Sequence, residues 1–164
     1  MSEFLSVEML KSLLVYNPAT GVFYWIQPKV LQKLRPDGRA GSLGRNGYEY
    51  IRVNGKLYLS HRLAILYMTG SRPEADVDHI NGDTSDNRWV NLRGATRQQN
   101  LWNSSPRAKK IVRQKGVWRY KQGYRASIYV DGRSRHLGVY SSAEEAHAAY
   151  AAAAVRLRGE FART

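Results

Sequence analysis

A short stretch, residues 77–100, limits the fold of this chain more than any other part of the sequence. An apolar-flanked run carries Asp78 and His79, a loop rich in Gly, Asp and Asn follows, and a second run begins at Asn91. A polar segment that starts near Thr96 then has the composition of a helix. The pattern predicts a strand, a loop, a second strand and a helix, in that order.

Local signals also predict the elements that precede this stretch. Leucines at helical spacing indicate a helix over residues 6–15 with Ser6 as its N-cap. A turn then leads into an aromatic strand that ends at Trp25, and residues 27–46 have the composition of an exposed loop. The beginning of the chain is therefore expected to mix helix and strand.

An Asn-Gly pair is the clearest turn signal in the chain. Asn54 and Gly55 separate two runs of alternating apolar and polar residues. Both positions of a two-residue hairpin turn need a positive φ, which these two residue types tolerate. We therefore predict a β-hairpin here, followed by a helix that Ser60 caps and Gly70 ends.

The last third of the chain predicts a second module. Its three expected strands cover residues 116–120, 124–130 and 133–140. The run 141–145 contains two overlapping capping boxes, and an alanine-rich helix follows over residues 143–157. Small alanines let a helix lie close to a sheet, so we predict an α+β protein whose second module is a three-stranded antiparallel sheet packed on one helix.

The net charge is unevenly divided between the modules. The chain carries 26 Lys and Arg against 13 Asp and Glu, a formal charge of +13. Residues 1–104 hold 13 basic and 9 acidic side chains, a net +4, whereas residues 105–164 hold 13 and 4, a net +9. An anionic partner relieves such a surplus; nucleic acid is the first candidate and an anionic membrane surface the second.

Residues 105–115 are basic and show no clear hydrophobic period, so we interpret them as a linker between the two modules, with a loop inside one domain as the alternative.

Several classes of protein are excluded by composition. No cysteine is present, which excludes disulfide scaffolds, thiol catalysis and cysteine-ligated zinc. No apolar run approaches the roughly 18 residues that a membrane helix requires. The N-terminus also lacks the basic flank and cleavage site of a signal peptide. We therefore expect no structural zinc and no membrane partner.

The motifs resemble those of the HNH endonucleases, which belong to the ββα-metal nuclease superfamily. The similarity is to the phage and intron-encoded group, whose third motif position is Asn instead of His. The matching segments are His61-Arg62-Leu63, Asp78-His79-Ile80-Asn81-Gly82-Asp83, Asn91-Leu92-Arg93 and Asn100. The resemblance implies an N-terminal HNH endonuclease domain over residues 1–104, with its ββα-metal core at about residues 76–103.

Phosphodiester hydrolysis explains these residue types. His79 is suited to take a proton from the attacking water as general base. One divalent cation, Mg²⁺ or Mn²⁺, prefers oxygen ligands, and Asp78 offers a carboxylate while Asn100 offers an amide oxygen. By resemblance, Asn91 bonds the loop and orients the base. Neighbouring strand residues point to opposite sides, so Asp78 and His79 reach one site only if the strand twists or His79 crosses the loop.

Three further polar residues lie in or near these motifs. His61 either contacts phosphate or has a structural role at a helix start, which we favour. Asp83 and Asp86 could be additional metal ligands, but Asx turns that shape the loop are the preferred interpretation.

Residues 116–162 resemble the Apetala-type, ethylene-response-factor DNA-binding domain. The matching residues are Gly116-Val117, Tyr124-Arg125-Ala126, Arg133, His136-Leu137-Gly138, Glu144-Glu145-Ala146, Ala149-Tyr150, Ala152-Ala153 and Leu157-Arg158-Gly159-Glu160-Phe161-Ala162. In that family the sheet lies in the DNA major groove and the helix braces it from behind. The resemblance implies a DNA-binding domain over residues 116–164. Trp118, Tyr120 and His136 depart from the plant pattern, so the plant target sequence does not carry over.

Strand alternation predicts which side chains face DNA. Ala126, Ile128 and Val130 point toward the helix, which leaves aromatic and basic side chains for base edges and phosphates. The candidate DNA-binding residues of the sheet are Trp118, Arg119, Tyr120, Arg125, Tyr129, Arg133, Arg135 and His136. Lys109, Lys110 and Arg113 of the linker are expected to add phosphate contacts.

These observations predict a metal-dependent DNA endonuclease of the phage-encoded or homing type. Double-stranded DNA is the expected partner, and the cytoplasm of a bacterial or phage-infected cell is the expected location. One alternative is a DNA-binding transcriptional regulator with an inactive HNH domain. Another is an RNA-directed nuclease or binder, which a sheet that reads the major groove disfavours. A monomer and a dimer both fit the sequence.

Overall fold

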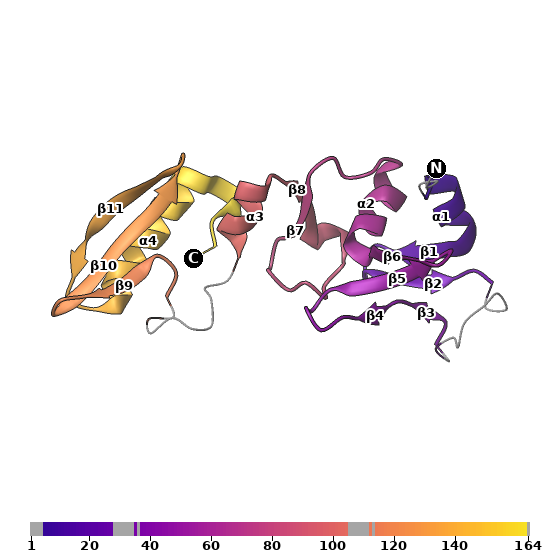
Figure 1. Cartoon of the computed structure of the whole chain (residues 1–164), viewed down its shortest axis with the longest axis horizontal. Coiled ribbons are helices and arrows are strands. Elements are labelled where there is room, and N and C mark those ends of the chain that lie inside the picture. The colour runs from indigo at the N-terminus through magenta and orange to yellow at the C-terminus, as the bar shows by residue number, and fades with distance from the viewer. Residues whose placement is uncertain (1–4, 28–34, 36, 105–111, 113, 164) are drawn as a thin grey trace. The chain divides into compact units, whose positions relative to one another are not determined.

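The structure is a computed structural model, and it describes residues 5–27, 35, 37–104, 112 and 114–163. The chain forms two compact units, one up to Thr96 and one from Arg97 onward (Figure 1). Each unit encloses hydrophobic side chains of its own. The sequence predicts a boundary at residue 104, whereas this division falls before helix α3 (Arg97–Asn103). The predicted mixture of helices and antiparallel strands is confirmed.

A short helix leads into the first sheet. Helix α1 (Val7–Leu13) follows Ser6, whose Oγ accepts a hydrogen bond from Met9 N at 3.2 Å, so the predicted N-cap is confirmed. The helix ends earlier than predicted because Leu14 is extended and starts a strand. The sheet has the order β1-β2-β3, with β1 (Leu14–Asn17), β2 (Val22–Trp25) and β3 (Arg39–Ala40).

The second sheet contains the predicted hairpin. Its strands are β4 (Ser42–Leu43), β5 (Glu49–Val53) and β6 (Lys56–Leu59). Asn54 and Gly55 form the turn with φ of 48° and 79°, which confirms the prediction from the Asn-Gly pair. The prediction of one loop over residues 27–46 was wrong where β3 and β4 form, because strands this short carry no alternation that a sequence pattern can reveal.

Helix α2 (Ser60–Thr69) follows directly on β6. Its N-cap position is Leu59, which makes no side-chain hydrogen bond, and Ser60 is the first helical residue. The predicted capping role of Ser60 is therefore wrong, because packing buries its hydroxyl inside the unit. The predicted helix end is confirmed: Gly70 adopts φ 74° and its N–H donates to Leu66 O at 3.0 Å.

A two-stranded sheet completes the first unit. Strand β7 (Asp76–His79) pairs antiparallel with β8 (Leu92–Ala95), with Asp78 opposite Arg93 and His79 opposite Leu92. The predicted strand, loop and strand are confirmed, except that Asn91 ends the 3₁₀ turn η1 (Trp89–Asn91) just before β8. The core of the unit includes the fully buried side chains Leu10, Leu14, Phe23, Ile51 and Val53.

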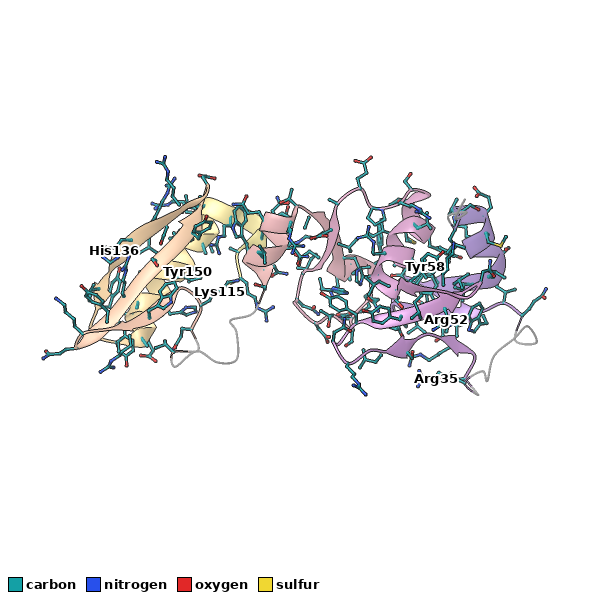
Figure 2. The ribbon with its side chains drawn as sticks, viewed as in Figure 1. Arg35, Arg52, Tyr58, Lys115, His136 and Tyr150 are labelled. Carbon is teal, nitrogen blue, oxygen red and sulfur yellow. The ribbon has the colours of Figure 1, made fainter. Side chains whose placement is uncertain are left out.

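The second unit contains the predicted sheet and helix. Strand β10 is central in the antiparallel order β11-β10-β9, and the strands are β9 (Val117–Tyr120), β10 (Gly123–Val130) and β11 (Arg133–Tyr140). Helix α4 (Ala143–Arg158) packs on the sheet, followed by the short η2 (Gly159–Phe161). Figure 2 shows Tyr150 on the side of α4 that meets the sheet. A Cβ at Gly116 would lie 1.9 Å from the Tyr150 ring, so only glycine fits this approach.

Hydrogen bonds define the start of α4. Ser142 is the N-cap: its Oγ accepts from Glu145 N, and the Glu145 carboxylate accepts from Ser142 N. Of the two predicted capping boxes, this is the one that forms. The Glu145 carboxylate also accepts a 2.7 Å hydrogen bond from Ser141 Oγ.

Helix α3 belongs to the second unit because three cations hold its C-terminal end. Lys115 Nζ donates to the carbonyl oxygens of Trp102 and Ser104, and Arg163 donates to Asn103 O at 3.4 Å. The Arg158 guanidinium lies 5.3 Å from the Trp102 ring centre. Burial, together with Arg158 and Arg163, lowers the pKa of Lys115 to about 8.

Across the described part of the chain, no helix combines the length and apolar character that a bilayer crossing requires.

Candidate active site and nucleic-acid surface

Strand β7 turns Asp78 and His79 toward different partners. Both side chains are buried, at 4% exposure each. The carboxylate of Asp78 accepts from Arg93, which lies opposite it on β8, while Nε2 of His79 lies 3.1 Å from Oδ1 of Asn87. The alternation expected of a strand is thus retained, with Arg93 at Asp78 and Asn87 at His79.

Asn87 is the residue that the sequence interpretation missed. Its side chain is 2% exposed and contacts His79 through Oδ1 and Glu49 through Nδ2, which donates to the Glu49 carboxylate at 3.3 Å. Its backbone carbonyl accepts a 2.7 Å hydrogen bond from Tyr16 Oη. The sequence signal for this residue was its place in a polar loop beside the motif, which does not by itself indicate a contact with His79.

The aromatic rings of Tyr48 and His61 also pack around His79. The His61 and His79 ring centres are 5.0 Å apart at 83°, and the Tyr48 ring is 5.3 Å from His61 and 6.0 Å from His79. Burial first, and then the charges of His79 and Arg62, lower the pKa of His61 to about 3. A buried, neutral imidazole favours the structural role for His61 over a phosphate contact.

Asn91 bonds both ends of the loop that precedes it. Its Oδ1 accepts from Asn81 N at 3.0 Å, and its Nδ2 donates to Asp86 O at 2.7 Å. This arrangement matches the loop-bonding part of its predicted role. The side chain at Nε2 of His79, the predicted base, is that of Asn87, and the role of Asn91 in orienting that base stays a prediction.

The two loop aspartates form the turns that were preferred over metal ligation. Asp83 Oδ1 accepts from the backbone N–H and the hydroxyl of Ser85, and Asp86 Oδ1 accepts from Arg88 N and Nε. The hydrogen bond from the Arg88 side chain is the main cause that lowers the pKa of Asp86 to about 2. The loop is therefore shaped by local side-chain hydrogen bonds.

The sheet of the second unit presents aromatic and basic side chains on its outer face. Trp118 and Arg125 are directly opposite each other, so they lie on the same face, and Ser127 pairs in the same way with His136. Trp118, Tyr120 and Tyr129 are 43%, 41% and 57% exposed. A shallow hollow of 370 Å³ is lined by Trp118, Tyr120, Arg125 and Ser127 of this face, together with Arg119, which lies between Trp118 and Tyr120 on β9.

Three predicted DNA-binding arginines project from the opposite face. Arg133 and Arg135 pair with Val130 and Ile128, which are buried against α4, and Arg119 pairs with Tyr124 and donates to its hydroxyl. The register of the strands thus divides the eight predicted DNA-binding residues of the sheet between two faces, and their contact with DNA stays a prediction. Figure 2 shows His136 on β11. Lys109, Lys110 and Arg113 lie outside the described residues.

Comparison with known proteins finds similarity to HNH endonucleases. Residues 58–101 match the family model described as HNH endonuclease. This segment is therefore similar to the HNH endonucleases. The chain is also 34% identical over 122 residues to an uncharacterized HNH endonuclease of Acanthamoeba polyphaga mimivirus; the matched region is 73% of this chain and 63% of that relative. Among solved structures, it is similar to the DNA-binding and DNA-cleaving HNH homing endonuclease I-HmuI, with a TM-score of 0.46, 23% identity, and coverage of 88% of this chain and 80% of that one.

The two predicted metal ligands lie in different units. Asp78 is on β7, and Asn100 is on α3 of the second unit. Their oxygen atoms suit a hard divalent cation. No cluster of three or more His, Cys, Asp or Glu side chains that could hold a metal ion occurs among the described residues. A two-ligand site on Asp78 and Asn100 therefore stays a prediction.

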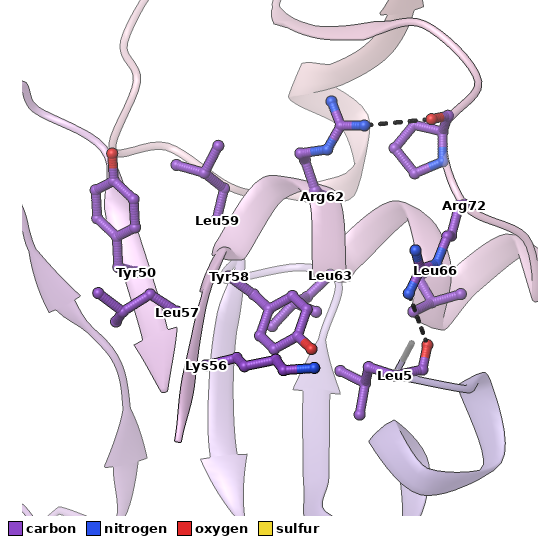
Figure 3. Close-up of a pocket in the computed structure, with 11 residues that line it drawn as sticks. Leu5, Tyr50, Lys56, Leu57, Tyr58, Leu59, Arg62, Leu63, Leu66 and Arg72 are labelled. Atoms are coloured by element: carbon purple, nitrogen blue, oxygen red, sulfur yellow. Dashed lines mark hydrogen bonds between the residues drawn. The ribbon is translucent and has the colours of Figure 1, made fainter. Parts of the chain in front are cut away.

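The first unit also contains an apolar pocket of 610 Å³ (Figure 3). Leu5, Leu57, Leu63 and Leu66 contribute to its lining. The two arginines that line this pocket donate to backbone carbonyl oxygens, Arg62 to Pro73 O at 3.3 Å and Arg72 to Leu5 O at 3.4 Å. The predicted catalytic and metal-binding residues are not among the residues that line it.

Proposed function

We propose that this protein is a metal-dependent DNA endonuclease that hydrolyses phosphodiester bonds. The observation that carries the proposal is the buried His79 ring, held by Asn87 inside a segment that matches the HNH endonuclease family model. A general base needs a fixed orientation, and the contact with Asn87 supports one for this residue. A phage-encoded or homing-type setting follows from the resemblance of the motifs.

Each predicted site residue receives a role in this proposal. His79 takes the proton of the attacking water, and Asn91 holds the loop between Asn81 and Asp86. Asp78 and Asn100 would hold one Mg²⁺ or Mn²⁺ ion. When bound, the ion would offset the negative charge that develops on the phosphate.

The second unit is proposed to supply most of the affinity for double-stranded DNA. Its outer sheet face carries Trp118, Tyr120 and Arg125, a combination suited to base edges and phosphates. This assignment agrees with the resemblance of residues 116–162 to Apetala-type domains. The linker residues Lys109, Lys110 and Arg113 would add phosphate contacts that weaken as salt rises.

Plasmid cleavage tests the proposal directly. Supercoiled DNA incubated with the full chain and Mg²⁺ or Mn²⁺ should be nicked or linearised, and EDTA should stop the reaction. His79→Ala should remove cleavage while retaining affinity for DNA in fluorescence anisotropy, because the base does not contribute to the binding surface. Cleavage that persists in this variant would remove His79 as the base.

A regulator with an inert HNH domain is the second candidate, and one observation favours it. The Asp78 carboxylate is hydrogen-bonded to the Arg93 guanidinium, which competes for the oxygen that a metal ion would need. Calorimetry with Mn²⁺ separates the candidates. An endonuclease should bind Mn²⁺ and lose that binding in the Asp78→Ala and Asn100→Ala double variant. A protein with an inert HNH domain should bind DNA but no Mn²⁺.

A further inference from the structure

We infer that Asn87 and Glu49 are positioning residues that hold His79 in a single tautomer, with its proton on Nε2 and its lone pair on Nδ1. Glu49 is on β5, 38 residues before Asn87, and lies outside the segment that matches the HNH family model. The role in catalysis rests on the proposed function, whereas the tautomer itself does not.

The contact between Asn87 and His79 determines the position of the proton. Oδ1 of Asn87 lies 3.1 Å from Nε2 of His79, and a carbonyl oxygen can only accept a hydrogen bond. Nε2 must therefore donate, and in a neutral imidazole the other nitrogen then carries the lone pair. Nδ1 becomes the atom that can take a proton from water.

Glu49 determines which way round the Asn87 amide lies. Nδ2 of Asn87 donates to Oε2 of Glu49 at 3.3 Å and is 3.5 Å from Ser85 O. A flipped amide would place its oxygen against the Glu49 carboxylate and its NH₂ group against Nε2 of His79. Two acceptors facing each other in a partly buried site are unfavourable, so the carboxylate selects the orientation in which Oδ1 faces His79.

The hairpin of β1 and β2 fixes the backbone at Asn87. Tyr16 Oη donates to the carbonyl of Asn87 at 2.7 Å, and Trp89 N donates to Pro18 O at 3.0 Å. A Cβ at Gly21, which has φ 75°, would lie 2.4 Å from the carbonyl carbon of Asn87. The Asn87 side chain therefore has little freedom to move away from His79.

Ring ¹⁵N NMR of the full chain at pH 8.5 tests the tautomer without any need for activity. The chain has four histidines, so the His79 signals can be assigned by comparison with His79→Gln. The wild type should show a protonated Nε2 and an unprotonated Nδ1. Glu49→Leu should give a mixture of tautomers, and the matched change of an exposed acid, Glu74→Leu, should leave the pattern unchanged. A wild-type ring protonated on Nδ1, or no response to Glu49→Leu, would overturn the inference.

A charge-swapped pair tests the same chain of contacts by rescue. Asn87→Asp places two carboxylates together and should lower kcat on the order of 10–100-fold with little change in KM. Adding Glu49→Gln supplies an amide that donates to the new carboxylate, which still accepts from Nε2 of His79. The double variant should recover kcat to within a few-fold of the wild type. A double variant as slow as the single one would contradict a positioning role.

The two measurements separate this inference from the proposed function. If the wild type cleaves no DNA but the tautomer responds to Glu49→Leu, the positioning is correct and the endonuclease proposal fails. If the wild type cleaves DNA and the tautomer does not respond, the positioning fails and the endonuclease proposal stands.

Discussion

Arg93 donates two hydrogen bonds to a single oxygen of Asp78, from Nε at 2.9 Å and from Nη2 at 2.8 Å. The two side chains are 12% and 5% exposed, so this ion pair is largely removed from water. Asp78, a predicted metal ligand, thus also forms a largely buried ion pair with Arg93. Removal of either charge leaves the other poorly solvated, so stability and metal binding are linked at this residue.

Asp78→Ala should therefore lower the free energy of unfolding by about 3 kcal/mol, because Arg93 loses its counter-charge. The double variant Asp78→Leu with Arg93→Leu should recover much of this loss while remaining unable to cleave DNA. Urea unfolding and plasmid cleavage measure the two effects. Equal stability of Asp78→Ala and the wild type would show that the pair contributes nothing.

The lowered pKa of His61 predicts that the first unit loses stability in acid. This pKa is about 3 in the folded chain, below the ordinary value near 6.5, through burial and the charges of His79 and Arg62, with the Tyr48 ring packed alongside. The unfolded chain binds a proton that the folded chain excludes as pH falls from 6.5. The free energy of unfolding should thus decrease by roughly 3–5 kcal/mol between pH 6.5 and pH 3.

Amide hydrogen exchange in α2 and β7 measures this loss within the first unit. His61→Phe, which keeps a ring in the core, should reduce the pH dependence, and His136→Phe, a change at an exposed histidine, should not. The same acid sensitivity in His61→Phe as in the wild type would assign it to other groups.

Gly21 and Gly55 form a matched pair for the contact with Asn87. Both have positive φ, 75° and 79°, but a Cβ at Gly21 would meet the Asn87 backbone, and a Cβ at Gly55 meets nothing within 4 Å. Gly55→Ala should cost about 1 kcal/mol in backbone strain, and Gly21→Ala should cost about 3 kcal/mol or more because the hairpin must also move. Thermal unfolding compares them; similar midpoints would mean that the contact is easily relaxed.

The two faces of the second sheet predict different effects on DNA binding. Trp118→Ala with Arg125→Ala removes side chains of the outer face and should weaken binding by about tenfold to a hundredfold. Arg133→Ala with Arg135→Ala acts on the face that meets α4 and should change mainly the salt dependence, through lost phosphate contacts. Fluorescence anisotropy at several salt concentrations checks both. A larger loss from the second pair would reverse the assignment of the DNA-facing side.

Elements with local causes could be predicted from the sequence. The Asn54-Gly55 turn, the Ser6 cap, the αL end of α2 at Gly70 and the Ser142–Glu145 capping box depend on residues within one turn of each other. Side-chain chemistry at short range determines such features almost independently of the rest of the fold. The strand, loop, strand and helix of residues 77–100 could be predicted for a similar reason, because the spacing of residues along the chain defines their order.

The partners of the site were decided only by tertiary structure. Arg93 pairs with Asp78 because β7 and β8 have one particular register, and Asn87 meets Glu49 and Tyr16 across 38 and 71 residues of chain. The register likewise placed Arg133 and Arg135 on the face opposite Arg125. The sequence by itself determined which residues can take a proton, bind an oxygen-seeking cation or turn the chain. Packing decided which of them meet, because contacts between distant segments depend on how the whole core closes.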